Sequence, residues 1–306
     1  MSKLNIDKLK PVELEDFEHL KEALKRHPSP RSAYSIVSLM IWGRQFDAQW
    51  MEYDDRVIFY NNTWNCILMP VGPFFSPEKM SLISDTFCQS GRCGNFTLVD
   101  SDYVQMYLHD LDNFDIIEDW VNADYVYLSE KLARLSGKKL QKKKNLISQF
   151  NRLFGEYTVT DISVEDRDDC LALSDKWYDK DVHSEEGVLL ERHALLTTFD
   201  HFELLEVGGK KILYNGEMIA FSIYSEAKDD MAIIHFEKYD SDYKGLAQLI
   251  NWETAKHLST MYHYINREED LGLPGLRRAK QSYQPINHLV SYRFVRKKKN
   301  KMASNY

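Results

Sequence analysis

The segment Ile265–Pro285, with the sequence INREEDLGLPGLRRAKQSYQP, is the part of the chain around which the predicted fold is organised. It begins as the end of a strand, because tyrosines alternate with His263 just before it, and the pattern breaks at Gly272. Pro274 then opens a short predicted helix, since proline is well suited to the first turn of a helix. Ligands of open α/β sheets bind just beyond strand ends, so we expect a site where this strand stops.

Length and composition place the chain among ordinary globular proteins. It has 306 residues, of which 43% are hydrophobic and 28% are charged, and it is long enough for two domains of about 150 residues each. The formal net charge is −8, so we expect no binding to DNA, and any contact with a polyanion must come from a local basic patch. The first residues, MSKLNIDKLK, lack the apolar core of a secretory signal, and no apolar run is long enough to cross a bilayer. A cytoplasmic location without a transmembrane segment is therefore the expectation.

The sequence lacks the motifs of several enzyme classes. The four cysteines form no CxxC pair and the ten histidines have no metal-ligand spacing, so no metal site is predicted. The chain also has no GxSxG, P-loop or GxGxxG motif, which leaves lipase, NTPase and Rossmann dehydrogenase functions without support.

The order of predicted elements repeats after about half the chain. Near the N-terminus, the range 6–9 suits a short strand, a hairpin turns at Asn61-Asn62, and a helix spans Pro77 to about Gln89. The Asn215-Gly216 turn, a strong hairpin signal, lies half a chain length after the first hairpin. An internal repeat of this size predicts a duplicated domain, although apolar periodicity also repeats by chance.

A strand, a glycine-containing turn and a helix start meet at Asp242–Ala247. N–H groups at a helix N-terminus point outward with partial positive charge, which suits phosphate, and Lys244, Gly245 and Ala247 are the candidate residues. The end of this turn resembles the loop with which GNAT acyltransferases hold the pyrophosphate of coenzyme A. Asp242 departs from that loop, because an acidic side chain repels pyrophosphate, and a helix-start glycine without a ligand remains the alternative.

A run of lysines, KKLQKKKN at 138–145, is the second candidate. Lysines four residues apart stack on one helical surface and repel one another unless an anion relieves them. The run therefore hints at a phosphate-bearing partner, and a solvated basic face is the alternative.

The segment after the predicted strand end carries the remaining candidates. Glu268 and Asp270 are suited to orient an amine or to serve as a general base. Arg277 and Lys280 could hold an anion, and Tyr283 could donate a proton to a leaving group. An exposed loop and helix whose charges neutralise one another fits the same residue types.

Two segments together resemble a known family. The segments are LSGKKLQKKKNLISQF, residues 135–150, and the opening segment at 265–285, and the family is that of the phosphatidylglycerol lysyltransferase C-terminal domain. In that family a GKK…KKRN helix joins two halves, and an N-x-E-x-D-x-G…GLR-x-A-K-x-S-Y-x-P segment closes the second. The order and separation of both motifs match here.

This resemblance implies an α/β (α+β) fold of two tandem GNAT-like acyltransferase domains, each a mixed central sheet flanked by helices, related to the Fem-type aminoacyltransferases. The expected bounds are 1–135 and 157–306 for the domains and 136–156 for a connecting basic helix. The membrane-embedded flippase portion of the full lysyltransferases is not expected here, so the resemblance does not imply a phospholipid acceptor. The residues carried over by motif are Lys142, Lys143, Lys144, Asn145, Asn266, Glu268, Asp270, Gly272, Arg277, Lys280 and Tyr283.

The leading hypothesis is an enzyme that moves an activated acyl or aminoacyl group to an amine or hydroxyl acceptor. The donor would be anionic, an aminoacyl-tRNA, and the basic clusters would hold its phosphates while the site orients the reacting groups. Two alternatives stay open: an N-acyltransferase that uses acyl-CoA, and a binding module on the same fold without catalysis.

Overall fold

Secondary-structure elements recur in the same order in the two halves of the chain. The computed structural model describes residues 4–178, 185–228 and 230–297. In each half a strand, two helices, a hairpin and a third strand are followed by a helix, a strand, a helix and a long strand. This order agrees with the predicted tandem α/β architecture.

The bounds of the elements are as follows. The first half has β1 (Lys10–Pro11), α1 (Phe17–Lys25), α2 (Ile36–Trp42), β2 (Ala48–Tyr53), β3 (Arg56–Asn61), β4 (Cys66–Leu68), α3 (Pro77–Gln89), β5 (Phe96–Asp100), α4 (Ser101–Tyr107) and β6 (Phe114–Leu128). The connection has α5 (Ser129–Arg134) and α6 (Gln141–Phe154). The second half has β7 (Thr158–Asp161), α7 (Arg167–Tyr178), α8 (Glu185–Asp200), β8 (Gly208–Tyr214), β9 (Glu217–Lys228), β10 (Met231–Tyr239), α9 (Leu246–Leu258), β11 (Tyr264–Asn266), α10 (Pro274–Gln281) and β12 (Asn287–Arg296). Short 3-10 helices are η1 (Ile6–Lys8), η2 (Leu14–Asp16), η3 (Ser32–Tyr34), η4 (Leu108–Asp110), η5 (Lys138–Leu140) and η6 (Val164–Asp166).

The strand predicted at residues 6–9 is wrong. The side chain of Asn5 accepts a hydrogen bond from the backbone N–H of Asp7 at 3.1 Å, which caps a 3-10 turn instead. Strand pairing begins only at Lys10, which lies opposite Trp50.

The Asn215-Gly216 turn is confirmed, and its counterpart in the first half differs from the predicted one. Tyr214 and Glu217 are paired directly across the turn, and both turn residues have positive φ, 52° and 85°, as two-residue hairpin turns require. The corresponding two-residue turn of the first half is Asp54-Asp55, with φ of 48° and 59°. Asn61 is the last residue of β3 and Asn62 the first of the connection to β4. These two strands are antiparallel, with Asn61 opposite Cys66, so the hairpin predicted around Asn61-Asn62 is present.

The long last strand of each half pairs with a strand of the other half. In β12, residues 291–294 pair with β5, and in β6, residues 126–128 pair with β11. The two compact units of the structure therefore combine segments from both halves: unit 1 comprises Met1–Val12, Phe46–Asn122 and Val290–Tyr306, and unit 2 comprises Glu13–Gln45 and Ala123–Leu289. The boundaries of these units differ from those of the predicted domains 1–135 and 157–306. A repeat in the sequence does not specify whether the last strand of each half pairs within that half or with the other half. The boundaries of the repeat stay a prediction.

Unit 1 carries the antiparallel strands β1, β2, β3 and β4, followed by β5, which pairs with β4 in parallel. Helix α3 has the predicted bounds, and the side chain of Ser76 caps it by accepting a hydrogen bond from the N–H of Lys79 at 3.3 Å. Its inner face buries Met80, Ile83 and Phe87. Within the residues that the structure describes, no helix is both long and apolar enough to cross a membrane.

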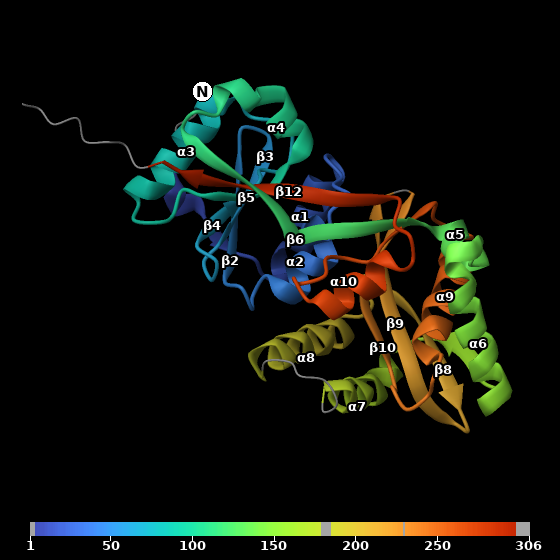
Figure 1. Ribbon diagram of the computed structural model, residues 1–306. Coiled ribbons are helices and arrows are strands. Elements are labelled where there is room, and N and C mark those ends of the chain that lie inside the picture. Colours follow the sequence, from blue (N-terminus) through green and yellow to red (C-terminus); the bar gives the residue numbers. More distant parts are fainter. Residues whose placement is uncertain (1–3, 179–184, 229, 298–306) are drawn as a thin grey trace, which may run out of the picture. The chain divides into compact units, whose positions relative to one another are not determined.

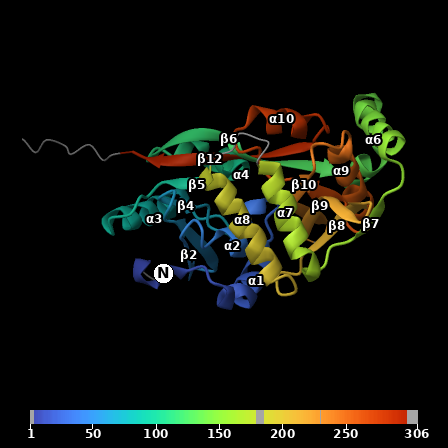
Figure 2. The ribbon, with the colours of Figure 1, turned by 90° about the horizontal axis from the view of Figure 1, so that it is seen from below.

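Unit 2 holds the segment on which the sequence analysis centred. Strands β7 to β10 are antiparallel, and β11 pairs with β10 in parallel. Helix α9 covers one face of β8, β9 and β10, and α7 lies on the other face (Figure 1). Figure 2 shows α7 and α8 side by side. The core under α9 includes Leu246, Leu249, Ile250, Ile212, Ala220, Ala232 and Ile234.

Candidate functional site

The candidate site lies in unit 2, where β10 and β11 part. The two strands pair only from Met231 and Tyr264 to Ile233 and Asn266, and β10 then continues alone. The chain beyond β11 stays bound to β6 instead, because the N–H of Arg267 donates to the carbonyl of Tyr125 at 3.0 Å. The second half of β10 therefore contacts residues 267 and 268 by side chains and not by backbone hydrogen bonds.

An ion pair bridges this divergence on the side of α9. Arg267 Nη2 lies 2.8 Å from Glu237 Oε1, and Asn251 Nδ2 donates to the other carboxyl oxygen at 3.1 Å. The guanidinium lies 5.0 Å from the ring centre of Tyr283, a distance at which cation–π attraction operates. Arg267 Nη1 and Asn251 Oδ1 are buried and have no hydrogen-bond partner in the described part of the chain. Most buried polar groups are hydrogen-bonded to protein or to water, so these two atoms mark a place where a further polar partner can bind.

Lys143 of α6 lies on the same ring. Its Nζ is 4.1 Å from the ring centre of Tyr283, and the side chain is half-buried. Burial, together with the positive charges of Arg267 and Lys142, lowers the pKa of Lys143 to about 8. An ammonium group that loses its proton this easily gains much from a nearby anion.

The other basic residues of the connecting segment face solvent. Lys142 and Lys144 are exposed, and so are the two lysines of η5. Asn145 is also exposed, and its Oδ1 accepts a hydrogen bond from Gln141 at 2.9 Å. The predicted lysine run therefore consists of one half-buried residue among exposed ones.

Glu268 contacts β10 at His235, whereas Arg267 contacts it at Glu237. Its Oε1 lies 3.0 Å from Nδ1 of His235, and its side chain keeps 21% of its surface exposed. Burial raises the pKa of Glu268 to about 8, with further contributions from the charges of Asp124 and Glu191, while Lys280 opposes the shift. A carboxyl group whose pKa lies near neutral pH is suited to general base catalysis.

The backbone at Glu268 is held in an uncommon conformation. Its φ is +57°, a region that non-glycine residues rarely adopt. Asn266 stabilises this turn: its Oδ1 accepts from the N–H of Glu268 at 2.7 Å, and its Nδ2 donates to Asp124 at 2.8 Å and to the carbonyl of Pro30 at 2.9 Å. Asn266 is fully buried. Its bonds therefore position Glu268, and they leave it no group to offer to a donor.

Asp270 is a fully buried structural anion. It accepts from Arg277 Nε at 2.7 Å and Nη2 at 3.0 Å, from the hydroxyl of Tyr125 at 2.6 Å and from the N–H of Gly272 at 2.9 Å. Burial acts to raise its pKa, but the hydrogen bonds from Arg277, Tyr125 and Gly272 outweigh it, and the pKa of Asp270 is lowered. With both oxygens occupied, this carboxylate fixes the turn before α10.

Lys280 is buried as well. Its Nζ donates to the carbonyl of Arg267 at 2.5 Å and to that of Glu269. Burial lowers its pKa, although the neighbouring acids Glu269 and Glu268 oppose the shift. The ammonium thus closes the loop between β11 and α10 and is not directed to solvent.

The glycine turn before α9 is closed by packing. Gly245 has φ of +95°, and a Cβ built there would lie 2.3 Å from the carbonyl oxygen of Leu146 in α6. Glycine is therefore required for α6 to pack against the start of α9. Lys244 is exposed and Ala247 half-buried beside it.

Of the predicted set, Lys143 and Tyr283 lie together beside Arg267, and Glu268 lies beside His235. Asn266, Asp270, Gly272, Arg277 and Lys280 form the framework of the loop that carries Glu268. Sequence reasoning missed His235, Glu237 and Asn251. The signal that could have found the first two is the group of polar residues, His235, Glu237 and Lys238, that follows the apolar start of β10, MAIIHFEKY.

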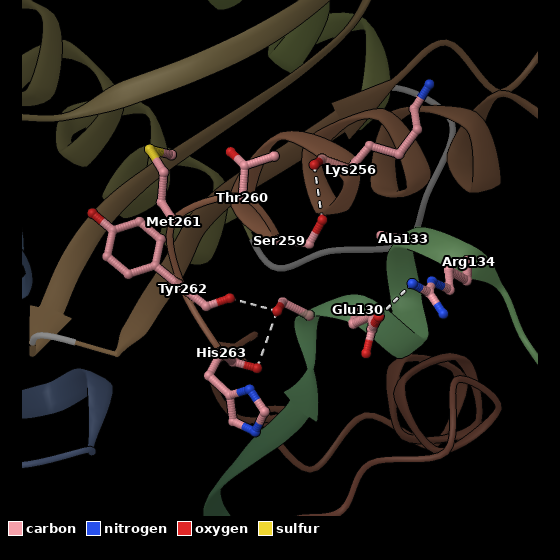
Figure 3. A pocket seen from close by; sticks show the side chains of 10 residues that line it. Glu130, Ala133, Arg134, Lys256, Ser259, Thr260, Met261, Tyr262 and His263 are labelled. Atoms are coloured by element: carbon pink, nitrogen blue, oxygen red, sulfur yellow. Dashed lines mark hydrogen bonds and ion pairs between the residues drawn. The ribbon is translucent and has the colours of Figure 1, made fainter.

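A separate hollow of about 610 Å³ lies where the N-terminus of α5 meets the C-terminus of α9 (Figure 3). The Oγ of Ser129 donates to the backbone carbonyl of His263 at 3.0 Å, and Glu130 and Arg134 form an ion pair at its rim. None of the predicted site residues lines this hollow.

Comparisons with known proteins agree with the predicted resemblance. A sequence model of the family "Phosphatidylglycerol lysyltransferase, C-terminal" matches residues 25–294. A crystal structure of a conserved protein of unknown function from Bacteroides thetaiotaomicron shares 30% identity, covers 94% of this chain and 99% of its own, and has a TM-score of 0.85. Comparison with curated protein sequences gives no match.

Two more distant structures share the fold. The C-terminal domain of a putative lysylphosphatidylglycerol synthetase from Agrobacterium fabrum is 16% identical, with 93% of this chain and 92% of that chain covered and a TM-score of 0.65. FemX is 9% identical, with 96% of each chain covered and a TM-score of 0.58. The predicted fold class and family resemblance are confirmed.

Proposed function

We propose an aminoacyl-transfer reaction for this chain, which belongs to the family of the phosphatidylglycerol lysyltransferase C-terminal domain. The donor is an aminoacyl-tRNA and the acceptor is an amine or a hydroxyl group. The observation that carries the proposal is the presence, at the β10–β11 divergence, of a partly exposed carboxyl group whose pKa is raised to about 8, together with a half-buried lysine of the basic helix α6 that lies over Tyr283 beside Arg267.

Glu268 is the general base of the proposed reaction. The acceptor nitrogen or oxygen attacks the ester carbonyl carbon of the donor and gives its proton to the carboxylate of Glu268. The new bond to the carbonyl carbon forms, the ester bond to the ribose oxygen breaks, and that oxygen receives the proton that Glu268 took from the acceptor. Asn266 and Asp270 act through the loop, because their hydrogen bonds hold Glu268 in place.

The donor side is the face with Lys143. Arg267 and Lys143 lie over the ring of Tyr283, so two positive charges are held at one place. Nη1 of Arg267 has no hydrogen-bond partner among the described residues. We assign the ester end of the donor to this pair. The exposed Lys142 and Lys144 then meet phosphates further along the tRNA.

Two earlier alternatives receive less support. An acyl-CoA donor would use the turn at Gly245, and that glycine is explained by its close approach to Leu146. A non-catalytic module does not account for the strained, partly exposed Glu268, since such strain is retained where surrounding structure enforces it, most often at functional sites.

The test is a single-turnover assay with labelled aminoacyl-tRNA, beginning with lysyl-tRNA, and a panel of amine and hydroxyl acceptors. The wild-type chain should move label from tRNA to an acceptor, and Glu268→Gln should slow the transfer about 10²–10⁴-fold, the usual contribution of a general base. The matched control is Glu217→Gln, since Glu217 is exposed at the hairpin end of β9. Equal rates for wild type and Glu268→Gln would remove Glu268 from the mechanism. Absence of transfer from every aminoacyl-tRNA tested would end the proposal.

A further inference from the structure

A chain of hydrogen bonds runs from Glu268 into the sheet across three neighbouring strand segments. Nδ1 of His235 lies 3.0 Å from Glu268 Oε1, and Nε2 of the same ring lies 2.7 Å from Oγ of Ser225. His235 sits at an irregularity of β10, because Ile234 and Phe236 are paired with neighbouring residues of β9 and His235 is the extra residue between them. A bulge of this kind re-aims a side chain, and here it lets one ring contact both neighbours.

The ring must remain uncharged. The side chain of His235 is 1% exposed, and burial lowers its pKa to about 3. A neutral imidazole carries a single proton, so one ring nitrogen donates and the other accepts. Two arrangements satisfy both contacts, one with Oε1 of Glu268 unprotonated and one with the proton on Oε1, and they differ by one proton in total.

In the first arrangement Glu268 is ionised. Nδ1–H donates to its carboxylate, and the hydroxyl of Ser225 donates to Nε2. In the second arrangement Glu268 is protonated and donates to Nδ1. Nε2–H then donates to Oγ of Ser225, whose own hydrogen turns to the carbonyl oxygen of Glu226, 3.5 Å away.

We propose that His235 is a positioning residue that changes tautomer whenever Glu268 gains or loses a proton, with Ser225 as the inner end of the relay. This inference rests on the proposed function, in which Glu268 takes the proton of the acceptor. The two states differ by one proton, which Glu268 carries on Oε1, and the ring holds its single proton on Nδ1 in one state and on Nε2 in the other after exchange through solvent, so the ring gains no charge. The relay keeps Oε1 in contact with the ring in both states.

The charges around Glu268 are compatible with such a two-state group. Lys280 faces it from α10 and favours the ionised form, while Asp124 of β6 and Glu191 of α8 favour the protonated form. Glu269 couples to the same lysine. Glu191 is itself paired with Lys238 of β10 at 2.8 Å, which moderates its effect. The balance of these groups sets where Glu268 titrates, and His235 follows.

The test is ¹⁵N–¹H NMR of the histidine rings in the full chain, which needs no substrate. From about pH 6 to about pH 10 the His235 ring should stay neutral, with its proton on Nε2 at the acid end and on Nδ1 at the alkaline end. Signals are assigned from their loss in His235→Gln or, if that variant does not fold, from their shift in Ser225→Ala. Glu268→Gln should abolish the change of tautomer.

A ring that carries protons on both nitrogens in this range, or that keeps one tautomer throughout, would overturn the relay. Because the readout is independent of activity, loss of the relay with transfer intact would refute only this inference. A tautomer change without any transfer would uphold the relay and refute the proposed reaction.

Discussion

Replacement of Gly245 by alanine should destabilise the protein through two separable effects. The left-handed backbone at φ +95° costs an alanine about 1–2 kcal/mol. In addition, the new Cβ would meet the carbonyl oxygen of Leu146 at 2.3 Å and Cβ of Phe150 at 3.2 Å, whereas ordinary contact begins at 3.4 Å. A backbone atom cannot rotate away, so α6 must shift, and such overpacking costs about 1–3 kcal/mol. The expected total is about 2–5 kcal/mol.

Gly216→Ala is the matched control. Gly216 also has positive φ, +85°, but a Cβ there meets nothing within 4 Å, so only the backbone cost applies. Both changes restrict the unfolded chain equally, and the difference between them isolates the packing of α6 on α9. The assay is urea unfolding followed by circular dichroism. Equal losses of unfolding free energy in the two variants would refute the reasoning, and with it the explanation of this glycine by packing.

Three further outcomes are expected. The pKa of Glu268 in the folded chain, about 8, lies above the ordinary glutamate pKa of 4.5, so the folded state holds its proton to higher pH and its stability should fall as pH rises from about 5 to about 8. In Glu268→Gln this fall in melting temperature should be smaller, and an unchanged fall would contradict the raised pKa. Tyr283→Ala should lower the free energy of unfolding by about 3–5 kcal/mol, because the ring beneath Lys143 is lost. Tyr283→Phe keeps the ring and should lower it by about 1 kcal/mol in thermal unfolding. Similar losses in the two variants would argue against the ring as the group that supports Lys143. Lys142→Ala combined with Lys144→Ala should make the plot of log K against log salt for tRNA binding less steep, by about 0.7–0.9 per lysine. Lys25 is an exposed residue of α1, and Lys25→Ala should leave the slope unchanged.

Local signals in the sequence predict much of the fold. Helix α3 begins at Pro77 and ends at Gln89 as expected, because proline at N1 and the Ser76 cap are local devices. The Asn215-Gly216 turn is equally local. The exchange of β6 and β12 between the halves could not be predicted from local signals, since a strand with the same alternating pattern can pair with either sheet. The strand expected at residues 6–9 was lost to a side-chain cap from Asn5.

The site was predictable in part for the same reason. The motifs contain Glu268, which follows β11, and Lys143 of α6, but they do not distinguish side chains that would meet a ligand from those that hold the loop. Asp270 and Lys280 carry charges typical of a binding site, yet both side chains are buried. Asp270 accepts hydrogen bonds from Arg277, and Lys280 donates to the carbonyl of Arg267. His235 was missed because only the pairing of β10 with its neighbours places it beside Glu268.

The most direct test of the account is the pH dependence of single-turnover aminoacyl transfer. If Glu268 is the base, the wild-type rate should rise with pH and level off above about 8, the value to which its pKa is raised. Glu268→Gln should be slow and should lack this transition, while Glu217→Gln should follow the wild type. A wild-type profile that is flat across this range, or a transition that persists in Glu268→Gln, would contradict the account.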